Sequence, residues 1–226
     1  MKVKLISHSQ IPPDEIIGDV WDLDPSLQDL VAYCARVSNP SNQMNTETSE
    51  KLIRYLAKHK HWSPFEMVSV CLEIETTRDI ARQILRHRSF SFQEFSQRYA
   101  DPTKELEFVT REARLQDPKN RQNSIVTDDE TLKSIWDTFQ RNVCDQAILA
   151  YQWAIKNGIA KEQARSVLPE GLTMSRMYVN GTLRSWMHYI ELRSANGTQL
   201  EHIEIAKECA KVIANIFPMI DEYVGE

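Results

Sequence analysis

The sequence predicts a single α+β domain, residues 1–226, that is rich in helix and built around a central, mainly antiparallel sheet. Segments 3–6, 67–74 and 172–179 carry the β-branched residues or the alternation typical of strands. Amphipathic patterns of helical period fill much of the remaining chain. No internal repeat and no linker between two cores is visible, and 226 residues suffice to bury one sizeable core.

The first half of the chain alternates between strand and helix patterns. Ser26 suits a helix N-cap because its hydroxyl can accept a backbone hydrogen bond, and Pro64 disfavours helix at the residue before it. We therefore expect, in order, a strand at 3–6 followed by a loop that contains prolines, a helix from Ser26 with Leu27, Leu30, Val31 and Cys34 on one side, a loop at 38–46, a helix at 48–58, an interruption at 61–66, a strand at 67–74 and a helix that begins after Thr77.

The second half is dominated by helical patterns. Gly158 closes the longest of them, as glycine commonly does after a helix, and Pro218 should break or kink the last one near Ile216. We expect a polar, irregular segment at 101–125, a long amphipathic helix at 128–157, a short helix at 161–167, a strand at 172–179, a helix at 182–193 and a helical segment at 199–224.

Composition narrows the functional classes. The net charge of −5 and the pI near 5.7 argue against a nucleic-acid-binding protein, which usually carries a basic excess. The four cysteines lie far apart without a CxxC pair, which predicts reduced thiols and a cytoplasmic location. No apolar run is long enough to span a membrane. We therefore expect neither a nucleic acid nor a membrane as partner.

A cluster of cationic and hydroxyl side chains lies between Arg86 and Tyr99. It holds three arginines, one histidine and three serines, which together suit phosphate oxygens. At the end of the preceding helix, Gln83, Arg86 and His87 share one face. A solvated helix end would also favour such cations, but so many like charges repel one another unless an anion compensates them. The sequence therefore predicts a site for a small anion.

Two other functions remain open at this point. The arginines could belong to a module that binds RNA or another phosphorylated partner without catalysis. Alternatively, the chain could be a nucleotide phosphohydrolase that uses the carboxylates and histidine of Glu201-His202-x-Glu204. No third ligand at a telling spacing accompanies His59 and His61, so we expect no metal site there.

The triplet Arg86-His87-Arg88, followed by seven residues and Ser96, resembles the signature of the flavin-dependent thymidylate synthases. Between about residues 50 and 205, the segments His61-Trp-Ser-Pro-Phe-Glu66 and Ala164–Pro169, together with Arg193 and Gln199-x-Glu201, are similar to the same family. Two positions depart from its pattern. Gly181-Thr182 looks like a short insertion, and Gly197 stands where some members have a histidine.

The resemblance implies a role for each matching residue. The flavin contacts would be His61, Ser63, Arg86, His87, Arg88, Ser89, Asn180, Arg184 and His188. The contacts to deoxyuridylate (dUMP) would be Gln83, Arg86, Glu94, Phe95, Ser96, Gln97, Arg98, Arg165 and Arg193. Of these, Arg193 would be catalytic and would stabilise charge on the uracil ring, and Arg165 would hold the phosphate.

The implied reaction is the reductive methylation of dUMP to dTMP. Methylenetetrahydrofolate would supply the carbon, and FAD reduced by NADPH would supply the hydride. No cysteine has an evident nucleophile setting, which suits a route without a protein thiol adduct. The resemblance also implies a homotetramer whose sites are shared between subunits.

Overall fold

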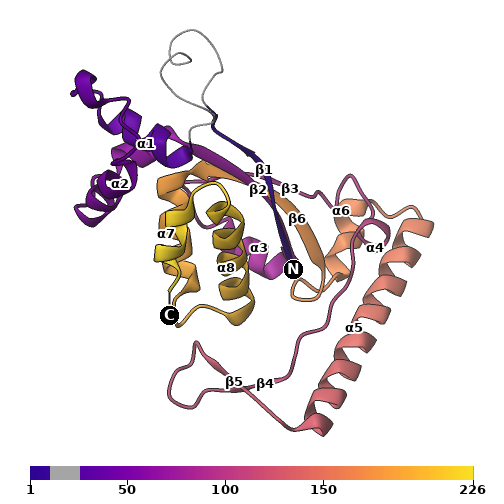
Figure 1. Cartoon of the computed structure of the whole chain (residues 1–226). Helices are drawn as coiled ribbons and strands as arrows, with labels where there is room; N and C mark the ends of the chain where they lie inside the picture. Colours follow the sequence, from indigo (N-terminus) through magenta and orange to yellow (C-terminus); the bar gives the residue numbers. More distant parts are fainter. Residues whose placement is uncertain (11–25, 226) are drawn as a thin grey trace.

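The computed structural model describes residues 1–10 and 26–225 (Figure 1). The elements follow in the order β1 (Lys2–His8), α1 (Leu27–Ala35), η1 (Pro40–Asn42), α2 (Ser49–Lys58), η2 (Ser63–Met67), β2 (Ser69–Thr77), α3 (Arg78–Ile84), β3 (Ser91–Glu94), α4 (Pro102–Glu105), β4 (Arg114–Gln116), β5 (Ser124–Val126), α5 (Glu130–Lys156), α6 (Lys161–Ala164), η3 (Arg165–Val167), β6 (Met174–Thr182), α7 (Leu183–Ser194), α8 (Leu200–Ala214) and η4 (Pro218–Tyr223), where η denotes a 3-10 helix.

A four-stranded sheet in the order β1-β2-β6-β3 forms the centre of the molecule. Each neighbouring pair is antiparallel, so the predicted fold class is confirmed. Along β2 the side chains alternate, and Val70, Leu72 and Ile74 are fully buried. This period of two is what a strand with one face on the core requires. Helices α7 and α8 lie side by side against the sheet (Figure 1).

Aromatic side chains join the sheet to α7. Trp186 donates a hydrogen bond from its ring nitrogen to the Val70 carbonyl, 3.0 Å away, and its ring lies 4.6 Å from that of Phe90. Gly181 makes room for this packing, since a Cβ atom there would lie 2.2 Å from the Phe90 ring. The turn that carries Arg86–Ser89 is therefore anchored to the core immediately after its last residue.

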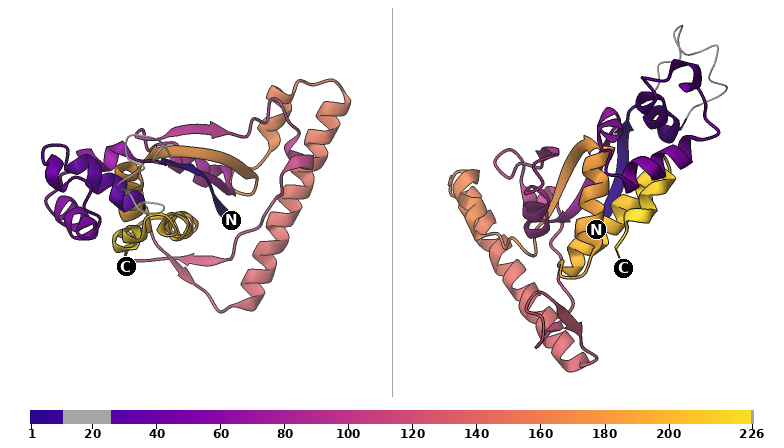
Figure 2. Two further views of the ribbon diagram at one scale, coloured as in Figure 1. Left: turned by 45° about the horizontal axis from the view of Figure 1, so that its top comes forward. Right: turned by 90° about the vertical axis from the view of Figure 1, so that its left-hand side faces the viewer.

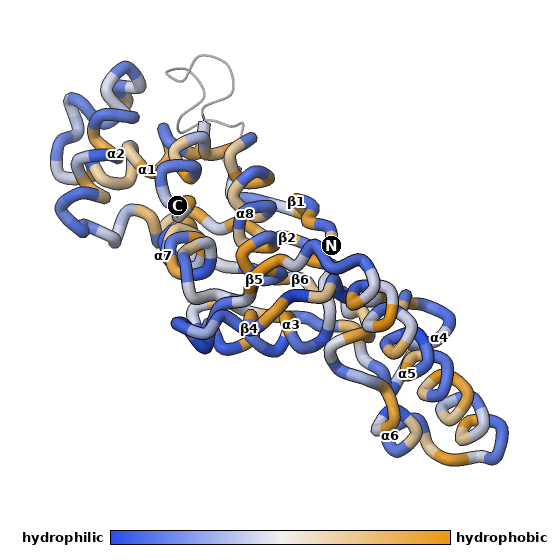
Figure 3. The backbone as a smooth tube through the Cα atoms, turned by 90° about the horizontal axis from the view of Figure 1, so that it is seen from below, coloured by the Kyte–Doolittle hydropathy of each residue, from blue (hydrophilic) through white to orange (hydrophobic). Residues whose placement is uncertain are grey.

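Helix α5 leaves this core and extends along one side of the molecule (Figure 2). Its 27 residues correspond to a length of about 40 Å. Hydrophobic positions recur along it (Figure 3), and many of them are exposed: Leu132, Ile135, Trp136, Phe139, Val143, Leu149 and Trp153. One side of the helix is buried, at Gln140, Cys144 and Ala147 and then at its C-terminal part, where Tyr151 and Ala154 pack against Ala164 and Leu168.

Several predicted elements have different bounds in the structure. Segment 101–125 is not irregular throughout, because it contains α4, β4 and β5. Residues 91–94, which were not predicted as a strand, form β3. The helical segment predicted at 199–224 breaks near Ile216 as expected, because α8 ends at Ala214 and Pro218 begins a separate 3-10 helix. The proline-containing loop expected after the first strand lies outside the described residues.

The predicted N-cap at Ser26 is confirmed. Ser26 caps α1 and forms a capping box with Asp29. The pairing of β2 with β6 continues without a register shift through Gly181 and Thr182, so the apparent insertion there produces no bulge. Among the described residues, no helix is long and apolar enough to cross a membrane.

Candidate active site

The arginine-rich segment forms a helix, a turn and a strand. Strand β2 runs directly into α3, which ends at Ile84, and the chain returns as β3 beside β6. Ser91 pairs with Asn180 in that ladder, and Ser185 donates a weak hydrogen bond to the Ser89 carbonyl at 3.4 Å. The predicted flavin residues Arg86–Ser89 and Asn180 therefore lie at the same edge, where β6 leads into α7.

His87 is fixed by a residue that is far away in the sequence. The Nε of Arg193 donates to the Nε2 of His87 at 2.8 Å, so His87 must be neutral and protonated on Nδ1. Burial lowers the pKa of His87 to about 4, and the positive charges of Arg193, His188 and Arg86 act in the same direction. The predicted catalytic arginine thus contacts the signature directly.

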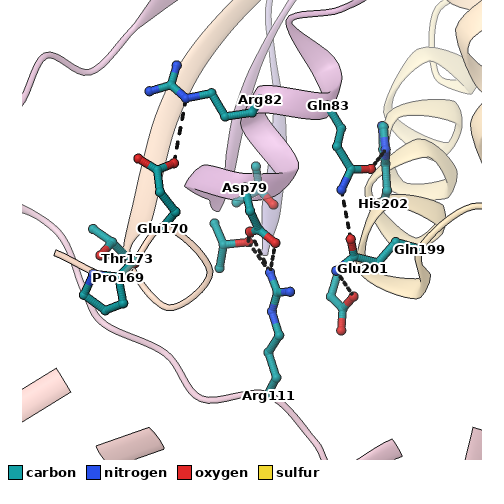
Figure 4. Close-up of polar contacts among 12 residues, drawn as sticks. Asp79, Arg82, Gln83, Arg111, Pro169, Glu170, Thr173, Gln199, Glu201 and His202 are labelled. Carbon is teal, nitrogen blue, oxygen red and sulfur yellow. Dashed lines mark hydrogen bonds and ion pairs between the residues drawn. The ribbon is translucent and has the colours of Figure 1, made fainter. Parts of the chain in front are cut away.

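Gln83 lies at the end of α3 within a chain of polar side chains (Figure 4). Its amide contacts Gln199 at 2.8 Å and the Nδ1 of His202 at 3.1 Å. The other ring nitrogen of His202 contacts the Tyr189 hydroxyl at 3.1 Å. Burial, with the charges of Arg193 and His87, lowers the pKa of His202 to about 3. Gln83 itself is half-buried.

Glu94 is held by cations of the same chain. Arg82 lies 3.1 Å and Arg78 3.5 Å from its carboxylate, and the Ser175 hydroxyl donates to it at 2.8 Å. Arg82 also faces Glu170 at 3.8 Å (Figure 4). These contacts fix β3 against α3. They also neutralise Arg78 and Arg82, which leaves other arginines to attract an anion.

Four arginines of the predicted site lack a carboxylate partner within residues 1–10 and 26–225: Arg86, Arg88, Arg165 and Arg193. Of these, Arg193 is already bonded to His87. Arg98 faces Glu162 of α6 at 3.6 Å, with both side chains exposed. Lys161 of the same helix donates to the Tyr99 carbonyl at 2.7 Å. The segments around Arg98 and Arg165 therefore run side by side.

The remaining residues predicted to bind dUMP surround this strand end. Phe95 continues the β3–β6 ladder, because its backbone N–H donates to the Arg176 carbonyl at 2.8 Å. Ser96 is half-buried and accepts a long hydrogen bond from the Arg98 backbone. Gln97 is buried, and its Nε2 has no hydrogen-bond partner in the described structure.

A cavity of about 330 Å³ opens beside α7. Its lining comes from α2, the turn that follows, α7 and η4: Ala57, Lys60, Trp62, Arg184, His188, Glu191 and Tyr223. Arg184 and His188, one helical turn apart, are both predicted flavin contacts. Arg184 also pairs with Glu66 at 2.6 Å. His61 and Ser63 are exposed on the adjoining segment, so all four predicted residues border or adjoin this cavity.

Sequence reasoning missed several polar residues of the site. Lys60 lines the cavity and adopts a positive φ of 58°, which is uncommon outside glycine. Gln199 and His202 contact Gln83, and Glu201 holds Gln199. The sequence offered Gln199-x-Glu201 as part of the family resemblance and Glu201-His202-x-Glu204 as a metal-binding alternative, but gave none of these residues a role at Gln83. Their α8 positions gave no signal, because their partner lies on a helix more than a hundred residues earlier. Within the part of the chain that the structure describes, no group of three or more His, Cys, Asp or Glu side chains converges as metal ligands would.

Comparison with known proteins identifies this arrangement. The Thy1 family model, described as thymidylate synthase complementing protein, matches residues 19–219. The chain belongs to the Thy1 family. It is 49% identical over 195 residues to a probable flavin-dependent thymidylate synthase of Paramecium bursaria Chlorella virus 1, covering 86% of this chain and 89% of the relative. It is 47% identical over 220 residues to the flavin-dependent thymidylate synthase of Synechocystis, covering 97% of each.

The Thy1 fold is also found in a solved structure. The UMP/dUMP methylase PolB of Streptomyces cacaoi, crystallised with 5-Br dUMP, superimposes with a TM-score of 0.76 at 27% identity, covering 98% of this chain and 93% of that one. As a Thy1 member the chain is a flavoprotein enzyme of the methyltransferase class. Its activity is flavin-dependent thymidylate synthesis, from dUMP to dTMP.

Proposed function

We propose that this Thy1 enzyme, acting as one domain over residues 1–226, methylates dUMP with methylenetetrahydrofolate as carbon donor, FAD as flavin and NADPH as reductant. The contact between Arg193 and His87 is the observation that carries the assignment of the site. It joins two halves of the predicted site that are 106 residues apart in the chain.

The residues present fit a flavin with a charged tail. The cavity beside α7 offers Lys60, Arg184 and His188 around the aromatic ring of Trp62. Arg86 and Arg88 add two exposed guanidinium groups without carboxylate partners among the described residues, which suit a diphosphate. We assign FAD binding to His61, Ser63, Arg86, His87, Arg88, Ser89, Asn180, Arg184 and His188. Bound there, the flavin would supply the hydride for the pyrimidine ring.

The nucleotide is assigned to the neighbouring edge. Arg165, Ser96 and Arg98 would clamp the phosphate, and Gln83 and Arg193 would contact the uracil edge. The hydrogen bond from Arg193 to His87 orients this guanidinium before the substrate arrives. A fixed cation beside the ring stabilises the negative charge that develops when the ring is activated. Glu94, Phe95 and Gln97 would shape the strand end beside them.

The cysteines support a route without a protein thiolate. Burial raises the pKa of all four thiols, Cys34, Cys71, Cys144 and Cys209, above their usual value. A raised pKa keeps a thiol protonated and therefore poorly nucleophilic at neutral pH. The four thiols are also unpaired, which favours the cytoplasm as the compartment.

We also propose that the enzyme assembles as a homotetramer with shared sites. The exposed apolar side chains of α5 form a continuous candidate interface, because single chains rarely expose so many large apolar residues along one helix. Replacing Trp136 and Phe139 together by glutamate should lower the mass measured by light scattering. A mass equal to one chain before mutation would contradict the tetramer.

The first test is the purified protein itself. It should show flavin absorbance and form dTMP only when dUMP, methylenetetrahydrofolate and NADPH are all present, with turnover unchanged by EDTA. A protein that gains no flavin on incubation with FAD would contradict the proposed function. Loss of dUMP without NADPH but dependent on a metal would indicate a phosphohydrolase instead.

A further inference from the structure

The polar chain at Gln83 has a single permitted direction of hydrogen bonding. It begins at Glu201, whose carboxylate is buried and accepts a bond from Arg114. Burial alone would raise the pKa of Glu201, but hydrogen bonds from the backbone and from Gln199, with the nearby charges of Arg114 and Arg111, lower it overall. Glu201 is therefore ionised and can only accept hydrogen bonds.

The donor and acceptor roles of each following group are then determined by the group before it. Gln199 must turn its NH2 group toward Glu201, at 2.9 Å, which leaves its carbonyl to accept from Gln83 at 2.8 Å. Gln83 must therefore turn its own carbonyl toward His202, which donates from Nδ1. The Nε2 of His202 is consequently unprotonated and accepts from the Tyr189 hydroxyl.

The orientation of the Gln83 amide thus follows from the network, although the oxygen and nitrogen of a free amide are interchangeable. One N–H and one carbonyl lone pair of Gln83 remain unused, since each end of the amide makes one contact. Reversal of the amide would exchange the positions of this donor and acceptor. Such a reversal is prohibited as long as Glu201 is a carboxylate.

Uracil and cytosine differ in the order of their hydrogen-bond donor and acceptor. On the edge formed by N3 and C4, uracil presents a donor and then an acceptor, whereas cytosine presents an acceptor and then a donor. An amide of fixed orientation matches one of these edges and opposes the other. A site with an amide free to rotate would accept both.

We propose that the chain Glu201–Gln199–Gln83–His202–Tyr189 makes Gln83 a specificity-determining residue, which selects uracil over cytosine nucleotides. This inference rests on the proposed function, which places Gln83 at the uracil edge. Gln199, Glu201 and His202 act as positioning residues through Gln83. Glu201 has the dominant effect, because each of the other four side chains can both donate and accept and could take part in a reversed chain.

Glu201→Gln is the decisive variant, because it preserves size while adding a donor. The new amide can still accept from Arg114 and can donate to Gln199, so the whole chain can reverse with every bond satisfied. Equilibrium binding of dUMP and dCMP to the flavin-loaded protein should show the ratio of the two Kd values falling about tenfold or more. Glu208→Gln, the same exchange two turns later on α8 beside Lys211, should leave the ratio at the wild-type value.

The outcomes separate the inference from the proposed function. If Gln83→Ala weakens dUMP binding but Glu201→Gln leaves the Kd ratio within twofold of wild type, the inference is wrong and the placement of Gln83 stands. If Gln83→Ala leaves dUMP binding unchanged, Gln83 does not contact the base. The inference and the placement of Gln83 at the uracil edge are then both wrong.

The tautomer of His202 provides a second test, which does not depend on nucleotide binding. Nitrogen-15 NMR of histidine-labelled enzyme, with the His202 signals assigned by their loss in His202→Asn, should show the proton on Nδ1. In Glu201→Gln a population protonated on Nε2 should appear. A wild-type proton on Nε2 would overturn the inference, whatever the binding data.

Discussion

The two ends of the proposed nucleotide site are built in opposite ways. Around Gln83 the polar groups are buried and bonded to one another, from Glu201 to Tyr189. At Arg86 and Arg165 the cations have no carboxylate partner among the described residues. A base is recognised by the direction of hydrogen bonds, which requires a rigid frame, whereas a phosphate is recognised by charge, which requires unneutralised cations. The same substrate therefore requires fixed, hydrogen-bonded side chains around its base and unpaired cations around its phosphate.

The largest effect is expected where the two ends meet, at Arg193. Arg193→Ala removes the fixed cation beside the ring and should reduce dTMP formation by about 10²–10³-fold, as removal of one charge-stabilising donor typically does. Flavin absorbance should be retained. Turnover assays with matched flavin occupancy measure this, and Arg193→Lys, which keeps charge but not the guanidinium fork, should recover only part of the activity. Unchanged turnover would remove Arg193 from the mechanism.

The open end should respond through affinity rather than turnover. Arg165→Ala removes a cation proposed to bind the phosphate and should weaken dUMP binding by about 10–100-fold, with a weaker dependence on salt. Calorimetric titration at two salt concentrations measures both. Arg141→Ala, on the surface of α5 and paired with Asp137, serves as the control. Equal losses in the two variants would contradict a specific role for Arg165.

The rigid end depends on close packing at Gly181. Gly181→Ala places a methyl group against the Phe90 ring, where the Cβ would be only 2.2 Å away. The variant should lose about 1–3 kcal/mol of unfolding free energy, measured by urea denaturation. Gly171→Ala is the matched control, because its nearest neighbour would be 4.0 Å away, and it should be close to neutral. A stable Gly181→Ala would show that this packing is less demanding than described.

Acid should weaken the rigid end by a smaller amount. The pKa values of His87 and His202, about 4 and about 3, lie below the usual 6.5. The unfolded chain therefore binds protons at a higher pH, so stability is unaffected above about pH 6.5 and falls as the pH decreases toward these values. A loss of about 1–2 kcal/mol between pH 7 and 6 is expected for the two histidines together. His202→Asn should show a smaller loss, and identical pH profiles would exclude His202 as a contributor.

The sequence predicted the local parts of this site better than its long-range parts. Ser26 and the amphipathic helices have signals within a few residues of one another, and their elements appear as expected. Strand β3 was missed because Phe92 is the only apolar residue of Ser91–Glu94, and its pairing with β6 depends on residues 83 to 89 positions away. The partners of Gln83 were missed for the same reason. The spacing of residues within α8 does not indicate which residues of α3 they contact. His202 meets the Gln83 amide only when the two helices pack in the folded protein.

Helix α5 connects assembly to the open end of the site. Its buried end packs on Ala164 and Leu168, which flank Arg165 on either side. Its outer length carries the uncovered apolar side chains. In the proposed tetramer, a partner that covered this outer length would set the angle of the helix, and a helix of about 40 Å would transmit that angle to its base. Subunit association would thereby position Arg165. The affinity for the phosphate would then depend on whether the enzyme is assembled.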